Sequence, residues 1–320
     1  MKYTRQFFII FSLLLTLPML SAAQDRYANI DSFVVKLGPM TTFNIATITD
    51  KLTSQYSSKE MKARAIFTWI AMHLSLDPKA VRSSDNKNVE PEKVIASRKT
   101  TSLGFSLLFQ EMCSQANIRC LSVDGYLKIS TEDIDEILDV AAFSWNVIQL
   151  GTSPNEWYYV DAAQASGYLD SKKTNFTRNF SPQYFFADKT TFNLEHFPDN
   201  QAWFLGEGYP SIKTFFSLPL IKPAAYDCRL SHPQPLTGKL LAKPGIPFTF
   251  SFQLKNAPDN PQIAVILGEG TKKQPPQRVN IRQQGITYSF DFTFKKEDTY
   301  PVTICINDQP VLTYLAEVSE

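Results

Sequence analysis

The sequence lacks an excess of charge of either sign. Its 320 residues carry 32 Lys and Arg against 31 Asp and Glu, a formal net charge of +1. Nucleic-acid and membrane-surface binders usually carry a clear positive excess, so neither partner is expected. Histidine is scarce, with three residues, and the four cysteines follow no zinc-binding spacing. We therefore expect no metal and no other cofactor.

Long hydrophobic runs are missing after the first 23 residues. Lys2 and Arg5 precede an apolar run from Phe7 to Leu20, and Ser21 and Ala23 follow it. The run is shorter than the about 20 residues that a bilayer span requires. The basic, apolar and small-residue order predicts a signal peptide over 1–23. We expect a secreted or periplasmic protein with no transmembrane segment after cleavage.

The cysteine count leaves the redox state open. An exported chain with Cys113, Cys120, Cys228 and Cys305 can form disulfides in any of three pairings. Four buried free thiols are the alternative, because cysteine is often a small core residue.

The order of elements predicts an α+β fold for residues 24–225. Helical patterns over 57–77 and 101–117 come first, and β-rich segments at 118–128, 141–150 and 155–164 follow. The last two segments are expected to form a hairpin. An acidic stretch around 131–136 is interpreted as an exposed insertion.

The last third of the chain has an all-β pattern. Residues 217–235 are rich in proline and aperiodic, which we interpret as a linker. Seven short alternating segments follow, which favours an immunoglobulin-like β-sandwich over 226–320.

Four separated segments share their order with one known family. They are "KARAIFTWIAMHLSLD", "PEKVIASRKTTSLGFSLLFQEM", "FSWNVIQLGTSPNEWYYVDAAQ" and "EHFPDNQAWFL". Together they resemble the transglutaminase-like cysteine-protease superfamily, in its kyphoscoliosis peptidase-like branch. The resemblance implies a papain-type core, with a Cys, a His and an Asp as catalytic residues.

Two catalytic positions differ from the family pattern. Ser102 stands at the Cys position, and Ser144, directly before Trp145, is assigned to the His position. Asp161 keeps the Asp. A serine hydroxyl needs a general base to become a nucleophile, and a neutral Ser144 is not one. We therefore interpret Ser102, Ser144 and Asp161 as a degenerate catalytic triad.

These observations favour a pseudoenzyme. The protein would bind a protein or an extended peptide in the former cleft, at Trp145, Asn146 and Trp157, or act as a scaffold. Two alternatives stay open. One is an active peptidase or amidase with a non-standard site, and the other is an envelope spacer with an adhesive sandwich.

Overall fold

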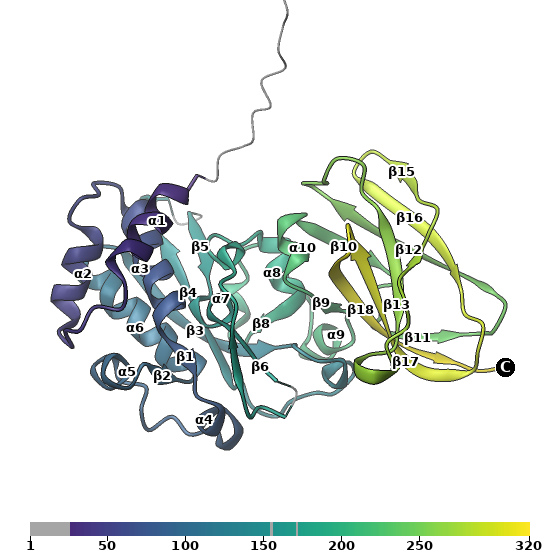
Figure 1. The fold of residues 1–320 in the computed structure, drawn as a ribbon, viewed down its shortest axis with the longest axis horizontal. Helices are drawn as coiled ribbons and strands as arrows, with labels where there is room; N and C mark the ends of the chain where they lie inside the picture. The colour runs from purple at the N-terminus through teal and green to yellow at the C-terminus, as the bar shows by residue number, and fades with distance from the viewer. Residues whose placement is uncertain (1–25, 154–155, 171) are drawn as a thin grey trace, which may run out of the picture.

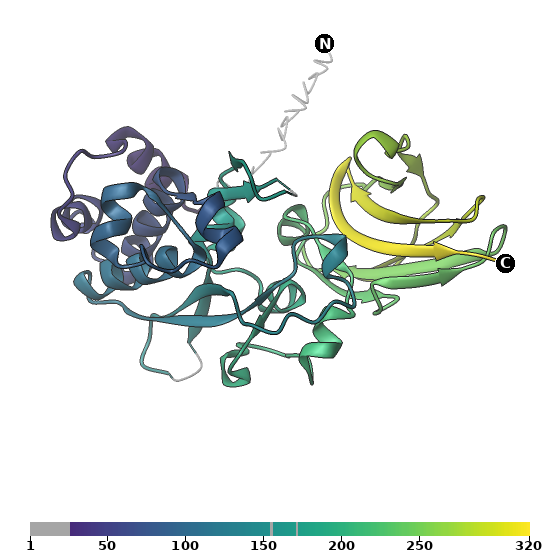
Figure 2. The ribbon, with the colours of Figure 1, turned by 90° about the horizontal axis from the view of Figure 1, so that it is seen from below.

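A computed structural model describes residues 26–153, 156–170 and 172–320. Helices gather at one end of the elongated molecule, a sheet follows, and a β-sandwich forms the other end (Figures 1 and 2). The N-terminal elements are α1 (Ala28–Leu37), α2 (Ile45–Thr53), α3 (Lys59–His73), β1 (Ser75–Leu76), α4 (Pro78–Ser83), α5 (Pro91–Ser97), β2 (Lys99–Thr100) and α6 (Ser102–Gln115).

Helix α3 is the centre of the helical layer. It begins after Ser58 with Glu60 in its first turn, as its sequence predicts. Residues 63–71 are all buried, so the helix has no solvent face in its middle. The buried Arg64 is tolerated there because it forms a salt bridge with Asp31 of α1.

The central sheet is antiparallel and has the strand order β5-β4-β3-β8. Its strands are β3 (Arg119–Leu127), β4 (Phe143–Gln149), β5 (Trp157–Val160) and β8 (His196–Pro198). The helices-then-sheet order and the β4–β5 hairpin confirm the α+β prediction. Strand β8 lies far along the chain from its neighbour β3, and this pairing brings a new segment to the sheet.

Short elements connect the sheet to the sandwich. They are η1 (Thr131–Asp133), α7 (Ala162–Ser166), β6 (Gly167–Leu169), β7 (Phe176–Arg178), η2 (Pro182–Tyr184), α8 (Lys189–Glu195), η3 (Gln201–Trp203), α9 (Ile212–Phe216), β9 (Leu220–Ile221) and α10 (Ala224–Asp227).

Two sheets face each other in the C-terminal region. One has the order β10-β12-β16-β15, and the other has the order β11-β18-β17-β13-β14 with β9 added to β18. The rings of Phe250 and Tyr314, one from each sheet, lie 5.4 Å apart between them. The strands are β10 (Leu230–Gln234), β11 (Lys239–Ala242), β12 (Pro247–Leu254), β13 (Ile263–Leu267), β14 (Gln277–Arg278), β15 (Arg282–Gln284), β16 (Thr287–Thr293), β17 (Asp298–Ile306) and β18 (Gln309–Val318), with η4 (Gly270–Lys272) after β13.

All seven predicted segments of this region contain strands. Their pairing is antiparallel except that β11 runs parallel to β18. The whole chain is thus mixed α+β, with its helices before its sandwich.

The interpretation of residues 217–235 as a linker is wrong. The segment contributes β9 to one sheet and β10 to the other. Leu218, Leu220 and Leu230 are fully buried. Each element here is too short to show a hydrophobic period, which is why the sequence pattern missed them. The division into separately folding units at 225/226 stays a prediction.

The predicted signal peptide, residues 1–23, lies outside the described residues. In the part of the chain that the structure describes, no helix combines the length and apolar character that crossing a bilayer demands. Cys113, Cys120, Cys228 and Cys305 are buried free thiols. Cys113 lies beside Cys120, and burial together with that neighbour raises the pKa of the Cys113 thiol.

Candidate active site

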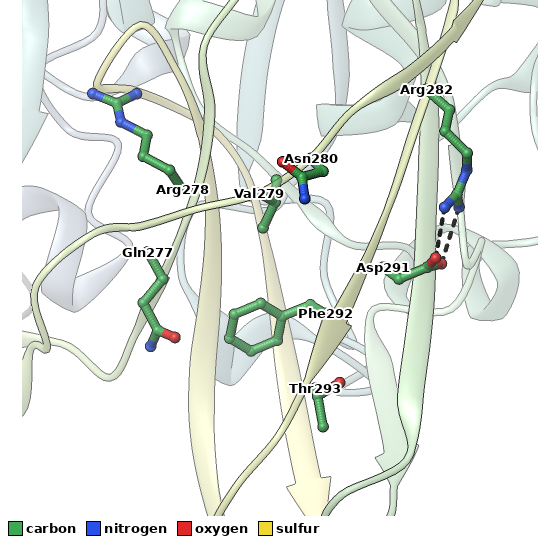
Figure 3. A pocket seen from close by; sticks show the side chains of 8 residues that line it. All are labelled: Gln277, Arg278, Val279, Asn280, Arg282, Asp291, Phe292 and Thr293. Carbon is green, nitrogen blue, oxygen red and sulfur yellow. Dashed lines mark hydrogen bonds and ion pairs between the residues drawn. The ribbon is translucent and has the colours of Figure 1, made fainter.

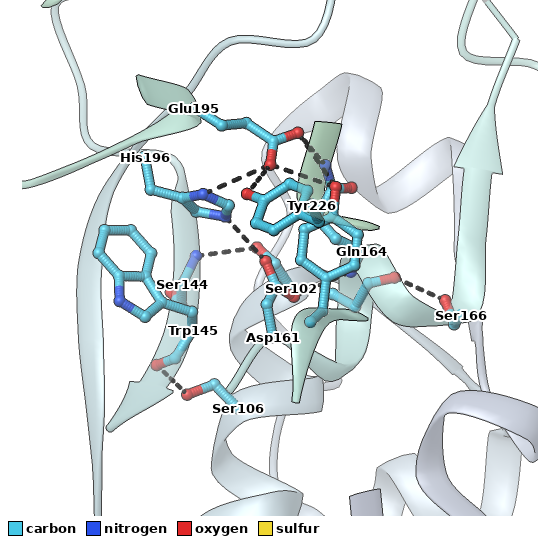
Figure 4. Close-up of polar contacts among 12 residues, drawn as sticks. Ser102, Ser106, Ser144, Trp145, Asp161, Gln164, Ser166, Glu195, His196 and Tyr226 are labelled. Carbon is cyan, nitrogen blue, oxygen red and sulfur yellow. Dashed lines mark hydrogen bonds and ion pairs between the residues drawn. The ribbon is translucent and has the colours of Figure 1, made fainter. Parts of the chain in front are cut away.

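Ser102 and Ser144 lie next to each other. Ser102 is the first residue of α6, and its Oγ accepts a hydrogen bond of 3.2 Å from the backbone N–H of Ser144 in β4 (Figure 4). Both are buried, with Ser102 4% exposed. The structure therefore brings together two of the three positions assigned to the degenerate triad.

The side chain of Ser144 turns away from the third position. Its hydroxyl donates to Asp124 Oδ1 at 2.7 Å, across the β3–β4 ladder. Successive side chains of a strand point to opposite faces. Phe143 and Trp145 accordingly share the other face, where their rings lie 5.9 and 5.2 Å from the ring of His196.

Asp161 keeps an imidazole partner, but this partner is His196 of β8. The carboxylate caps α7 by accepting from the N–H of Gln164, and its Oδ2 lies 3.0 Å from His196 Nε2. Sequence reasoning missed the pair because His196 belongs to a separate motif. Only the pairing of β8 with β3 reveals it, and no local pattern carries that signal.

A second carboxylate closes the other side of the imidazole. Glu195 Oε2 lies 3.7 Å from His196 Nδ1 and also accepts from the hydroxyls of Tyr184 and Tyr226. Burial raises the pKa of Glu195. The ring of His196 is fully buried and stacks on Phe192, with centroids 3.7 Å apart. Both ring nitrogens of His196 therefore face carboxylates, and neither faces Ser102 among the described hydrogen bonds.

Comparison with known proteins identifies the family of one part of the chain. Residues 46–162 match the model of the transglutaminase-like superfamily. This chain contains a transglutaminase-like domain. The matched residues include Ser102, Ser144 and Asp161, but His196 lies beyond them.

Relatives with this domain are longer proteins. Kyphoscoliosis peptidase of Mus musculus is 30% identical over 169 residues, which cover 52% of this chain and 25% of that protein. The chain thus spans about a quarter of the length of this curated relative.

Two solved structures are also similar. A putative protease from Parabacteroides distasonis ATCC 8503 matches over 89% of this chain and 58% of its own, with 12% identity and a TM-score of 0.27. The M1 domain from titin covers 26% of this chain and 89% of its own, with 13% identity and a TM-score of 0.16.

The family motif also fits this strand of the transglutaminase-like domain in a register that gives the base position a second assignment. The family strand to which this segment is similar reads His-Ala-Trp-Asn. When its last two residues are placed on Trp145 and Asn146, its His falls on Phe143 rather than Ser144. Phe143 lies on the face that carries His196 and Asp161, whereas Ser144 points to Asp124. A phenyl ring has no proton to exchange and a neutral hydroxyl is not a base near neutral pH, so neither Phe143 nor Ser144 can itself be a general base.

The three predicted cleft residues do not share an open surface. Trp145 is buried against Phe192 and His196. Asn146 is also buried, and its amide donates to two backbone carbonyls. Trp157 is half-buried, and its ring lies 5.4 Å from that of Trp203. Core packing therefore occupies Trp145 and Asn146.

Gly125 explains how Trp145 fits. A Cβ at this position would come within 2.5 Å of the Trp145 ring. The absence of a Cβ leaves room for the indole and for the carbonyl of Phe197, so Gly125 is a site residue that sequence reasoning did not single out.

Other candidate sites lie outside this cluster. Among the described residues no group of His, Cys, Asp and Glu side chains has a metal-binding arrangement. A polar hollow of about 440 Å³ lies in the sandwich, where Arg282 holds Asp291 in a two-point ion pair (Figure 3).

Proposed function

We propose that this protein is a catalytically inactive transglutaminase-like protein that acts as an exported protein- or peptide-binding or scaffolding module. The observation that carries the proposal is the state of the three catalytic positions. The nucleophile position holds Ser102, the base position holds Phe143 or Ser144, and Asp161 is bound to His196. Its core would be of papain type and its sandwich of immunoglobulin type.

The chemistry supports loss of reaction. In an active thiol enzyme the N-terminal end of a helix and a neighbouring imidazolium stabilise the Cys thiolate. Ser102 keeps the helix position, but a hydroxyl is far less acidic than a thiol and needs a general base. Nε2 of His196 is paired with Asp161, and Nδ1 lies 3.7 Å from Glu195 without a hydrogen bond, so no described hydrogen bond connects His196 with Ser102.

Enzymatic assays test the proposal directly. We expect the wild type to leave dimethylcasein uncleaved and to incorporate no dansylcadaverine into it. The matched variant Ser102→Ala should give the same background. Hydrolysis or transamidation by the wild type that disappears in Ser102→Ala would show an active serine enzyme and overturn the proposal.

One observation favours the alternative of an active enzyme. Asp161 and His196 form a His–Asp pair near Ser102, the type of pair that activates a serine in hydrolases. A fluorophosphonate probe labels a serine activated in this way. We expect no labelling of Ser102, and labelling that is lost in His196→Gln would support the alternative.

A further inference from the structure

A hollow of about 530 Å³ lies where the sandwich meets the loop after β3. Its lining consists of Asp135 from the loop, Thr237, Lys239, Leu240 and Leu241 from the β11 region, and Phe248 from β12. Leu240 is buried and Phe248 half-buried, so the hollow has an apolar floor.

Strand β11 is a free edge beside this hollow. It is the terminal strand of its sheet and pairs only with β18. Gly238 and Ala242 direct their carbonyls to β18. Because peptide groups alternate along a strand, the N–H and C=O groups of Lys239 and Leu241 point to the open side. Leu241 is 74% exposed, so an apolar side chain marks this edge.

The loop beside the edge is acidic and apolar. Residues 129–142 contain no Lys or Arg, and their carboxylates are Glu132, Asp133, Asp135, Glu136 and Asp139. The same loop exposes large aliphatic side chains, namely Ile129, Ile137, Leu138 and Val140. Among the described residues that line the hollow, Lys239 is the basic one, and it is paired with Glu317 at 3.1 Å.

The loop is anchored in this position. Asp133 accepts hydrogen bonds from the N–H groups of Ile129 and Ser130. The N–H of Asp135 donates to the carbonyl of Phe216 at 2.9 Å. A fixed loop of this kind presents its carboxylates without an ordering cost on binding.

We propose that this docking surface, formed by the β11 edge, the hollow and the loop 129–142, binds an extended segment of a partner protein in which Lys or Arg alternates with apolar residues. The segment adds a strand to β11 through main-chain hydrogen bonds. Its apolar side chains enter the hollow and contact Phe248, and its cations face the loop carboxylates. This inference rests on the proposed binding function and moves its site from the buried catalytic positions to the sandwich.

The test uses the full chain and fluorescein-labelled octapeptides. One peptide alternates lysine with valine, and a second alternates glutamate with valine. The third is the lysine peptide with methyl groups on alternate backbone nitrogens, so that one edge cannot donate hydrogen bonds. Fluorescence anisotropy should show binding of the lysine peptide and at least about tenfold weaker binding of the other two. Leu241→Lys should weaken binding of the lysine peptide by at least about tenfold, because the new cation on the edge repels the lysines of the peptide. Ile286→Lys, the same change at another exposed aliphatic residue, should have no effect.

Three results would overturn the proposal. The first is no binding of the lysine peptide, and the second is equal binding to Leu241→Lys and Ile286→Lys. The third is a dimer of this chain that Leu241→Lys dissociates, which would make a second copy the occupant. Binding that survives Leu241→Lys moves the site but keeps the binding function, whereas wild-type hydrolysis in the assays above contradicts the proposed function itself.

Discussion

At the scale of single residues, Asp161 of the candidate active site makes two contacts. Its carboxylate caps α7 by accepting from the N–H of Gln164 and lies 3.0 Å from Nε2 of His196. Trp145, Asn146 and Gly125 pack the same region tightly. The described residues around Asp161 thus form a closely packed core.

Thiol titration tests the register of the base position. In Ser102→Cys with Phe143→His, the new imidazolium should lie near the thiol and lower its pKa by about 1–3 units relative to Ser102→Cys alone. Ser102→Cys with Ser144→His should give no such decrease, since position 144 points to Asp124. Thiolate absorbance against pH measures both. A lower thiol pKa in the variant Ser102→Cys with Ser144→His would show that position 144 is the base position.

The buried Glu195 predicts a pH-dependent stability. Burial raises its pKa in the folded state, so the folded state binds this proton more tightly than the unfolded state. The contribution of Glu195 to the free energy of unfolding is complete below its pKa in the unfolded state, about 4.3. This contribution is lost as the pH rises through the higher pKa of the folded state. Glu195→Gln keeps an acceptor for Tyr184 and Tyr226 without the charge.

Urea unfolding at several pH values measures this effect. The free energy of unfolding of Glu195→Gln should increase relative to the wild type as the pH rises from 4.5 to 7. A difference that stays constant with pH would show that Glu195 does not carry this dependence.

At the scale of elements, a single buried lysine joins two segments that are distant in the chain. Lys128 follows β3, and its Nζ donates to the carbonyls of Phe215, Leu218 and Pro219, between α9 and β9. Burial lowers its pKa to about 7, although Asp133, Asp135 and Glu195 act in the opposite direction. The central sheet is therefore tied to the segment that leads into the sandwich.

Lys128→Met tests this connection. It removes the Nζ donor from three carbonyls, of which that of Phe215 keeps the N–H of Leu218, and should lower the free energy of unfolding by about 2–4 kcal/mol. Because the folded pKa is below the unfolded one, wild-type stability should rise with pH between about 7 and 10.4, and the variant should lack this rise. Thermal unfolding at pH 7 and 9.5 measures both, with the exposed Lys295→Met as control. A loss no larger than that of Lys295→Met would contradict the structural role.

At the scale of the whole molecule, one continuous core extends from the helical layer into the sandwich. The segment 217–235 belongs to that core, and it supplies β9 and β10 to the two sandwich sheets. The two ends of the molecule in Figure 1 are thus joined by packed elements.

This continuity predicts how fragments behave. Residues 236–320 alone lack β9 and β10, so they expose the faces that these strands cover and should not fold. Residues 217–320 retain both strands and should show more ordered β structure. Circular dichroism and thermal melting distinguish the two. A cooperative melt of 236–320 would show that the sandwich does not need the segment.

The sequence by itself determined the elements whose hydrophobic pattern is long. Helices α3 and α6, the β4–β5 hairpin and the seven sandwich segments each carry a period over enough residues to be detected. The order of the four motifs also assigned Ser102 and Asp161 to catalytic positions, because a motif is recognised from residue types and their spacing along the chain.

Only the tertiary structure decided what surrounds those residues. The pairing of β8 with β3 places His196 within hydrogen-bond distance of Asp161. Side chains alternate between the two faces of β4, so Phe143 points toward His196 and Ser144 points away from it. The same folding turns a proline-rich stretch into two strands of the sandwich. Contacts between residues distant in the chain leave no period in the sequence, since they depend on which segments pack side by side.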